Sequence, residues 1–285
     1  MTRAITHHTM YNMADTVFLS DADFESYRSL IYNESGITFT ATNRSILESR
    51  LKERLREKSI DSVKSYFDKI KKDQGELKGF LDSITTNLTR FFRNQAQFDA
   101  LEHFVVPEIM KIKKPSGNNT LKIWSAGCST GEEPYTIAML MNEVLPPPWK
   151  YEIVASDLSL KCLMTAKEAF YQESRIVGIP DNYLVKYFDK VDDGYKAKPS
   201  IVNPIRFDYH NLKNDSGLRG MDIVFCRNVI IYFDDAAQKV AIDRFWDAMS
   251  NKSFLFIGHS ESLFGMDTQF EFVKTQWATL YRKSI

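Results

Sequence analysis

A glycine-containing turn between a strand and a helix constrains the fold of this chain most. The apolar segment at 121–123 predicts a buried strand, and residues 136–141 predict a helix. Between them lies the sequence WSAGCSTGEEPY, residues 124–135, which contains Gly127 and Gly131. Strand, glycine turn and helix are the unit of a doubly wound α/β sheet, in which the backbone approaches a nucleotide-like ligand at the helix N-terminus.

The acidic residues around this turn indicate which ligand it suits. A second apolar run, 151–157, ends in Asp157, about where a Rossmann-like fold has the carboxylate that binds a ribose. A dinucleotide fingerprint needs three glycines, whereas this turn has two and continues with Glu132 and Glu133. Two carboxylates would repel a pyrophosphate but tolerate the ammonium and sulfonium groups of S-adenosylmethionine. We expect that cofactor; the alternative is that both glutamates only stabilise the helix N-terminus.

Composition argues against several other classes of protein. The 37 Lys and Arg residues balance 37 Asp and Glu residues, so nothing indicates a general nucleic-acid surface. No run of eighteen apolar residues occurs, and residues 1–15 lack the apolar core of a signal peptide. The three cysteines are widely spaced and form no C-x-x-C pair. We expect a cytoplasmic protein without a metal site or membrane insertion, and a monomer because no repeated apolar interface is indicated.

Helix signals dominate the first 85 residues. Ser20 followed by Asp23 is an N-cap pattern, and Gly36 marks the end of that first helix. Further helices are expected at 44–58, 63–71 and 76–85, with another after Asn94. These residues therefore predict an all-α domain in front of the α/β part.

From Leu121 onward, strands and helices alternate, which implies a largely parallel sheet. The expected strands are 121–125, 151–156, 205–209, 221–226, 253–258, 270–273 and 278–282. The last two form an antiparallel pair that suits a methyltransferase sheet better than a dehydrogenase sheet. A turn signal at Asp192, Asp193 and Gly194 predicts a small β insertion.

The predicted organisation combines an all-α domain with an α/β domain that has a Rossmann-like methyltransferase sheet. The predicted parts are a loose tail at 1–15, the helical domain at 16–88, a connecting helix and linker at 89–118, and the α/β domain at 119–285 with its β subdomain at about 187–206.

The helix predicted at 44–58 is locally basic, with six basic and three acidic residues. Arg50, Arg54 and Lys58 share one face of it. One interpretation is an ordinary solvated face with ion pairs between neighbouring turns. The other is a docking surface for an acidic partner.

Five motifs occur in collinear order: TTNLTRFFR at 85–93, SAGCSTGEEPY at 125–135, ASD at 155–157, FCRNVIIYF at 225–233 and GHSE at 258–261. Together they resemble the chemotaxis receptor methyltransferases, the CheR family, from about Leu19 to Tyr281. The resemblance implies methylation of glutamate side chains on the cytoplasmic helices of chemoreceptors. S-adenosylmethionine would be the methyl donor and S-adenosylhomocysteine the product.

The resemblance also implies a set of site residues. The cofactor would be bound by Asn87, Thr89, Arg93, Gly127, Glu133, Asp157, Asn211, Leu212, Arg227 and Asn228. Arg93 and Tyr232 match the two side chains expected nearest the transferred methyl group. Their alternatives are a structural salt bridge for Arg93 and core packing for Tyr232.

The implied reaction needs no general base, because an ionised carboxylate attacks the sulfonium methyl group directly. The enzyme must dehydrate and aim the nucleophile, which is a matter of proximity and preorganisation. Arg93 can orient a carboxylate with its guanidinium fork, and Tyr232 can donate a hydrogen bond and shield the sulfonium.

Other substrates are disfavoured by what the motifs lack. Methyltransferases for nucleobase amines typically carry an Asn/Asp-Pro-Pro-aromatic element where this chain has the sequence CRNV at 226–229. The segment 189–207 is short relative to family members that bind a receptor C-terminal pentapeptide by strand addition, so we expect no such tether. The remaining alternatives are a methyltransferase for another protein or a small molecule, and a catalytically inactive module that binds cofactor or receptor.

Overall fold

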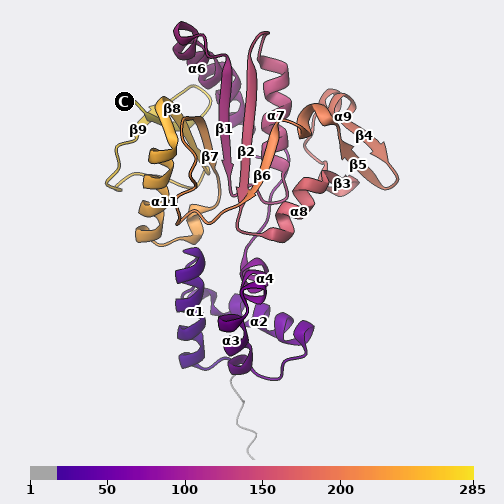
Figure 1. Ribbon diagram of the computed structural model, residues 1–285, viewed down its shortest axis with the longest axis vertical. Coiled ribbons are helices and arrows are strands. Elements are labelled where there is room, and N and C mark those ends of the chain that lie inside the picture. Colours follow the sequence, from indigo (N-terminus) through magenta and orange to yellow (C-terminus); the bar gives the residue numbers. More distant parts are fainter. Residues whose placement is uncertain (1–17) are drawn as a thin grey trace, which may run out of the picture.

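Four short helices form the N-terminal domain (Figure 1). A computed structural model describes residues 18–285, and the tail predicted at 1–15 lies outside them. The helices are α1 (Asp21–Ser35), α2 (Arg44–Lys58), α3 (Val63–Lys72) and α4 (Gln74–Ile84), with a 3-10 turn η1 (Ala41–Asn43) before α2. The predicted caps of α1 are confirmed: the Ser20 hydroxyl accepts the Asp23 N–H, and Gly36 ends the helix at φ 80°.

Leucines and aromatic residues form the core of this domain. Leu47 and Leu51 on α2 are fully buried, as their helical spacing predicts. Tyr27 packs edge-on against Phe80 at 5.6 Å, and its hydroxyl donates to the Val63 carbonyl at 2.7 Å. Burial of each such side chain contributes about 1.5–3 kcal/mol, which is how so small a domain holds its shape.

A seven-stranded sheet forms the centre of the C-terminal domain, in the order β6-β2-β1-β7-β8-β10-β9. The strands are β1 (Thr120–Ala126), β2 (Lys150–Asp157), β6 (Ile205–Tyr209), β7 (Met221–Cys226), β8 (Met249–Ile257), β9 (Glu271–Lys274) and β10 (Thr279–Lys283). The first five are parallel, and β10 pairs antiparallel with both β8 and β9, as the sequence predicts. The chain winds outward in opposite directions from β1, which opens a crevice at the carboxyl ends of the central strands.

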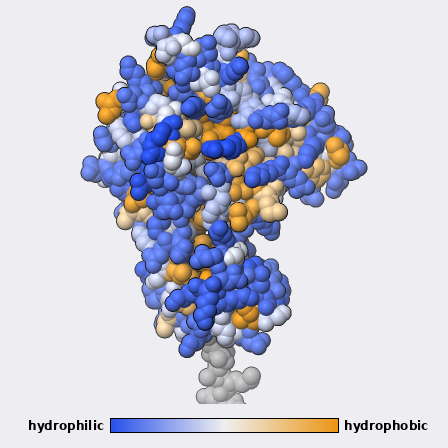
Figure 2. Space-filling model, viewed as in Figure 1, coloured by the Kyte–Doolittle hydropathy of each residue, from blue (hydrophilic) through white to orange (hydrophobic). Residues whose placement is uncertain are grey.

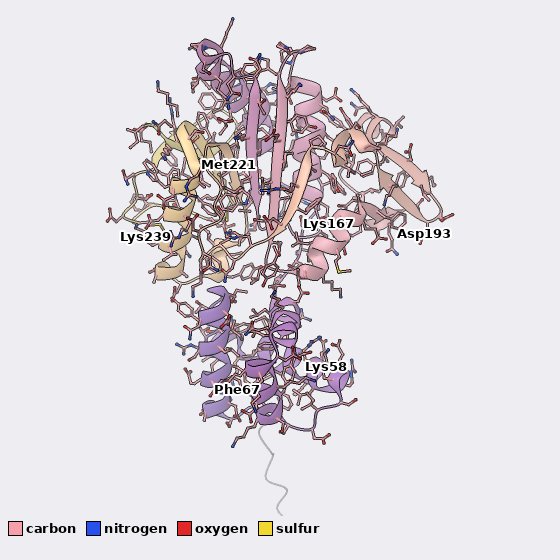
Figure 3. All side chains as sticks on the ribbon, viewed as in Figure 1. Lys58, Phe67, Lys167, Asp193, Met221 and Lys239 are labelled. Atoms are coloured by element: carbon pink, nitrogen blue, oxygen red, sulfur yellow. The ribbon has the colours of Figure 1, made fainter. Side chains whose placement is uncertain are left out.

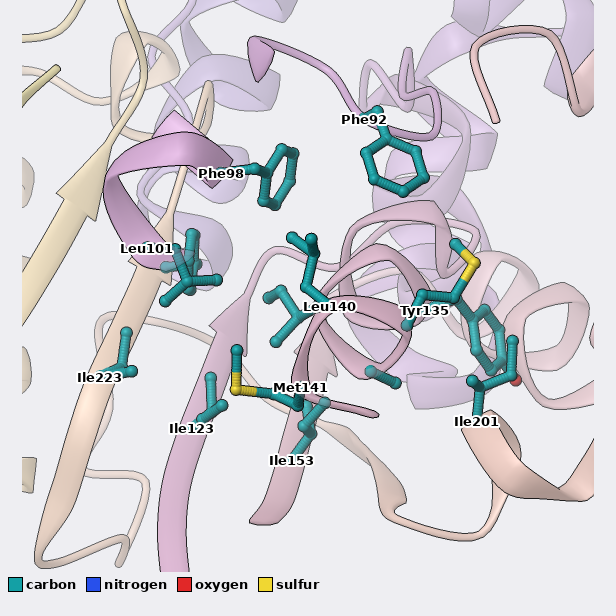
Figure 4. Packing of buried hydrophobic residues seen from close by; sticks show 14 of the residues in the cluster. Phe92, Phe98, Leu101, Ile123, Tyr135, Leu140, Met141, Ile153, Ile201 and Ile223 are labelled. Carbon is teal, nitrogen blue, oxygen red and sulfur yellow. The ribbon is translucent and has the colours of Figure 1, made fainter. Parts of the chain in front are cut away.

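Helices cover both faces of this sheet. They are α5 (Gln95–Ala100), a π-helical segment (Leu101–Val105), α6 (Val106–Lys113), the short turn η3 (Lys114–Ser116), α7 (Glu132–Val144), α8 (Leu160–Glu168) and α11 (Asp235–Ala248). Side chains alternate between the faces: Ile123 packs in the cluster that contains α7, and the next residue, Trp124, packs on α11. Figure 4 shows Ile123 and Ile153 beside Met141 of α7.

The β insertion is larger than the predicted segment 187–206. Its antiparallel sheet has the order β3-β5-β4, made of β3 (Phe170–Gln172), β4 (Phe188–Val191) and β5 (Gly194–Ala197). The turn η4 (Glu173–Arg175) and the helices α9 (Asp181–Tyr187) and α10 (Pro199–Val202) complete it. The sequence prediction missed β3 because three residues carry no periodic pattern, and it extended too far because residues from Ile205 belong to the main sheet. The predicted turn is confirmed, with Asp193 at the tip of the β4–β5 hairpin (Figure 3).

The two domains are held together at the C-terminal end of α1. Lys213 Nζ donates to the Tyr32 and Asn33 carbonyls at 2.8 and 3.1 Å, and Asn211 Nδ2 donates to the Glu34 carbonyl at 2.6 Å. These carbonyls belong to the last turn of α1, which has no basic residue of its own there. A lysine of the C-terminal domain therefore stabilises the negative end of this helix.

The segment after α1 continues this contact. Ile37 forms an antiparallel bridge with Phe233, and the Thr38 N–H donates to the Tyr232 carbonyl at 2.8 Å.

Hydrophilic residues cover most of the face seen in Figure 2, with hydrophobic residues gathered over the C-terminal domain. Within residues 18–285, no helix is long and apolar enough to span a bilayer.

Candidate active site

A cleft lies between the carboxyl ends of the central strands and the N-terminal domain. All the residues predicted for the cofactor and the methyl group line it: Asn87, Thr89, Arg93, Gly127, Glu133, Asp157, Asn211, Leu212, Arg227, Asn228 and Tyr232. They come from segments up to 145 positions apart in the sequence, and the sheet topology brings these segments together. Their individual roles remain predictions.

The glycine turn after β1 is shaped by close backbone contacts. Gly127 has φ 83°, and a Cβ there would lie 2.4 Å from Val229 Cγ2. The N–H groups of Gly127 and Cys128 both donate to the Ser156 carbonyl, at 2.8 and 3.0 Å. No residue with a side chain fits at Gly127 without displacing Val229, so the floor of the cleft stays open for a ligand.

Asp157 is held rigidly at the end of β2. Its Oδ2 accepts the Ser129 N–H and its Oδ1 accepts the Ser159 N–H, both at 2.8 Å. Burial raises the pKa of this carboxyl, and the two backbone hydrogen bonds partly offset the increase. A fixed carboxylate with remaining lone pairs can accept hydrogen bonds from the two hydroxyls of a ribose.

The two glutamates after the turn have different surroundings. Glu132 is fully buried, forms an ion pair with Arg175 of the insertion, and accepts the Thr130 hydroxyl at 2.7 Å. Glu133 lines the cleft, where Oε1 accepts the Ser125 hydroxyl at 2.7 Å. Glu132 is therefore structural, and Glu133 is the carboxylate that can meet a cationic ligand.

Arg227 is the buried cation of the cleft. Its Nη1 lies 3.3 Å from Glu133 Oε2, its Nη2 donates to the Arg93 carbonyl, and its guanidinium lies 5.1 Å from the centre of the Phe98 ring. Burial raises the pKa of Glu133 and lowers the pKa of Arg227, and their attraction opposes both shifts. Arg227 Nε is buried and has no partner among residues 18–285, so it can donate to an anionic group of a ligand.

Arg93 and Tyr232 lie in the same cleft on opposite chain segments. Arg93 Nη1 donates to the Leu88 carbonyl at 2.8 Å, a contact within its own segment rather than a salt bridge. Tyr232 is 36% exposed, which is too much for a residue whose task is core packing. The geometry thus supports neither a structural salt bridge for Arg93 nor core packing for Tyr232.

The comparisons with known proteins decide the family. Residues 87–279 match the family described as CheR methyltransferase, SAM binding domain, and residues 22–85 match CheR methyltransferase, all-alpha domain. The chain belongs to the CheR methyltransferase family. It therefore has the S-adenosylmethionine-binding methyltransferase domain that its glycine turn and Asp157 predict.

Three CheR relatives illustrate how far the similarity extends. A chemotaxis protein methyltransferase of Borreliella burgdorferi is 34% identical over 244 residues, which cover 83% of this chain and 86% of the relative. Chemotaxis protein methyltransferase 2 of Vibrio cholerae is 30% identical over 275 residues, 94% of each chain. The chemotaxis protein methyltransferase of Escherichia coli is 31% identical over 270 residues, 92% of this chain and 91% of the relative.

The CheR all-α domain contributes cleft residues that sequence reasoning missed. They are Ser35, Ile37, Thr38, Phe39, Asn43, Ile46 and Ile84. None belongs to a recognisable motif, because their place in the cleft depends on how the two domains dock. His210 of the C-terminal domain also lines the cleft and was missed as well. Burial lowers the pKa of its imidazole, which favours the neutral form.

The basic face of α2 in this CheR domain is partly occupied by internal ion pairs. Arg54 contacts Glu76 and Glu57, and Lys58 Nζ lies 2.9 Å from Glu76 Oε2. The Arg54 side chain is only 14% exposed, whereas Arg50 and Lys58 remain accessible. Figure 3 shows Lys58 in the helical domain, away from the main sheet. Docking of a partner by Arg50 and Lys58 stays a prediction, and Arg54 has a structural partner.

In the part of the chain that the structure describes, no three His, Cys, Asp or Glu residues gather as potential metal ligands. The three cysteines, Cys128, Cys162 and Cys226, are buried thiols. Burial raises the pKa of each.

Proposed function

We propose that this CheR member transfers the methyl group of S-adenosylmethionine to glutamate side chains of chemoreceptors, forming glutamyl methyl esters. The observation that carries the proposal is the gathering of Arg93, Tyr232 and the cofactor-binding residues in one cleft between the two domains. A nucleophile that enters from the N-terminal side meets a site already lined with donors for a carboxylate.

The residues of the cleft fit S-adenosylmethionine. Asp157 would hold the ribose hydroxyls, Glu133 the ammonium group and Arg227 the carboxylate, through its unpartnered Nε. Gly127 leaves the room that the cofactor needs. Asn211 uses its side chain to bind the Glu34 carbonyl, so its contact with the adenine would come from the backbone.

When bound, the cofactor supplies an electrophilic methyl group on a sulfonium. With the methyl group passed to a carboxylate oxygen of the substrate, the sulfur would leave as the neutral thioether of S-adenosylhomocysteine, and no proton would move. Arg93 would orient this carboxylate through paired hydrogen bonds, and Tyr232 would donate one more while its ring excludes water. Arg93 must not bind too tightly, because only interactions that persist into the transition state accelerate transfer.

The proposal includes a cytoplasmic monomer that finds receptors without a C-terminal pentapeptide tether. The outer strand β4 of the insertion has four residues, which offer few backbone groups to an added strand. Titration with a receptor tail peptide that ends in an aromatic residue tests this part. We expect no binding at micromolar concentrations, and micromolar affinity would contradict it.

The transfer itself is tested by incubating the protein with methyl-labelled S-adenosylmethionine and receptor-containing membranes, then treating them with mild base. Glutamyl methyl esters release volatile methanol, and excess S-adenosylhomocysteine should abolish the signal. Label that stays on the membranes after base would indicate a different acceptor group. No label despite measured cofactor binding would favour another substrate or a non-catalytic binding module.

A further inference from the structure

The carboxylate of Glu261 binds the backbone of the segment that carries Asn228 and Tyr232. Its Oε2 accepts the Asn228 N–H at 3.0 Å and also the Gly258 N–H, and its Oε1 accepts the Ile231 N–H at 3.2 Å. Glu261 belongs to the GHSE motif after β8, for which neither the sequence nor the proposed reaction assigns a role. Both carboxylate oxygens are thus used by backbone donors.

The GHSE motif at 258–261 packs closely against the segment that begins at Asn228. A Cβ at Gly258 would lie 2.5 Å from Glu261 Oε2 and 2.8 Å from the Asn228 nitrogen. Asn228 itself has φ 59°, a left-handed conformation that costs free energy in a residue with a side chain. A charged acceptor of three N–H groups can offset such a cost, since hydrogen bonds to charged groups are the stronger ones.

The held segment connects directly to the cleft. Asn228 and Val229 line it, the latter against Gly127. The chain then forms the turn η5 (Ile230–Tyr232), whose Ile231 N–H would have no acceptor within the turn itself. Tyr232, the next residue, carries the side chain expected beside the transferred methyl group. A shift of the Ile231 backbone would therefore move Tyr232.

We infer that Glu261 is a positioning residue for methyl transfer: its carboxylate fixes the Asn228–Tyr232 segment and so the place of the Tyr232 hydroxyl. This inference rests on the proposed function of Tyr232. Glu261 does not act as a base, because both of its oxygens are engaged by N–H groups and the reaction releases no proton.

Glu261→Gln tests the inference with little change of size, because an amide has one acceptor oxygen where the carboxylate has two. We expect kcat to fall about tenfold, as much as loss of the Tyr232 hydroxyl itself would lower it, because Glu261 acts through that group. Affinity for S-adenosylhomocysteine should fall about threefold to tenfold through Asn228. Asp267→Asn, on the exposed part of the same loop, is the matched control and should leave both values unchanged.

A double-mutant cycle with Tyr232→Phe separates positioning from general loosening. In the Tyr232→Phe background the hydroxyl is gone, so Glu261→Gln should lower kcat by no more than about threefold. An equal fall in kcat from Glu261→Gln in both backgrounds, or an unchanged kcat in Glu261→Gln alone, would overturn the inference.

If the unaltered protein transfers no methyl group to receptors, the proposed function fails separately. The affinity for S-adenosylhomocysteine then decides, since a Glu261→Gln protein that binds it normally would refute the positioning of Asn228.

Discussion

Charged residues that are neighbours in the sequence have different surroundings in this protein: some pair inside the fold, and others face the cleft. Glu132 pairs with Arg175 inside the fold, while Glu133 faces the cleft with Arg227. On α2, Arg54 and Lys58 both bind Glu76, whereas Arg50 contacts only the adjacent turn. The sequence shows which residues are charged, but the partners 22 and 18 positions away are found only by folding the chain.

Glu76 provides a test of stability at this scale. Burial alone would raise the pKa of its carboxyl, but hydrogen bonds from Lys58, Tyr66 and Arg54 lower it below the ordinary value. A carboxyl whose pKa is lowered by folding stabilises the folded protein above its unfolded pKa, and the contribution is lost as the pH falls through the folded pKa. Glu76→Gln should therefore destabilise the protein at pH 7, by about 2–4 kcal/mol.

Thermal unfolding of both proteins across pH measures this effect. The difference between them should shrink as the pH falls below the ordinary glutamate pKa and through the lowered pKa of the folded protein, because Glu76 then becomes neutral in both states. Glu57→Gln, an exposed partner of Arg54, is the control and should change stability little. A difference that stays constant with pH would contradict the ionic role of Glu76.

At the scale of elements, the β insertion supports the glycine turn between β1 and α7. The Tyr171 hydroxyl of β3 donates to the Thr130 carbonyl at 2.7 Å, and Arg175 Nη2 donates to Thr130 Oγ1 at 2.7 Å while pairing with Glu132. Gly131 is required beneath them, since a Cβ there would lie 2.9 Å from the Tyr171 hydroxyl oxygen. The insertion thus has a second task besides any receptor contact.

Arg175→Gln should weaken S-adenosylhomocysteine binding about tenfold, because it leaves the buried Glu132 carboxylate without its cation next to the turn. Isothermal titration of the purified protein measures the change. Lys190→Gln removes an exposed ion pair with Glu173 in the same insertion and should bind normally. Equal affinities for all three proteins would show that the insertion does not support the turn.

Most elements could be predicted from the sequence because their patterns are local. The alternation from Leu121 onward and the leucine spacing of α2 gave bounds within a few residues of those observed. The short strand β3 could not be predicted, since it exists only by pairing with β5. The motif residues of the cleft were foreseen from the CheR resemblance, while Thr38, Ile46 and the task of Glu261 depend on contacts between distant segments.

At the scale of the whole molecule, the cleft depends on the docking of the two domains. Asn211 and Lys213, next to the expected adenine site, both bind carbonyls in the last turn of α1. Cofactor binding and the position of the helical domain should therefore influence each other.

Lys213→Met should loosen this contact while leaving both cores intact. We expect faster hydrogen exchange in residues 32–36 and about threefold to tenfold weaker binding of S-adenosylhomocysteine, since charged hydrogen bonds to the helix end are lost. Lys239→Met, on the exposed face of α11, is the control. Unchanged exchange at 32–36 would mean that Lys213 does not hold the domains together.

The roles of Arg93 and Tyr232 in methyl transfer are the centre of this account. The most direct measurement compares turnover on receptor membranes with S-adenosylhomocysteine affinity for the unaltered protein, Arg93→Ala and Tyr232→Phe. We predict that Tyr232→Phe binds S-adenosylhomocysteine within about threefold of normal, and Arg93→Ala within about tenfold because Arg93 is also a predicted cofactor contact. Turnover at saturating cofactor should fall at least about 100-fold for Arg93→Ala and about tenfold for Tyr232→Phe. Near-normal turnover in both variants would contradict the account.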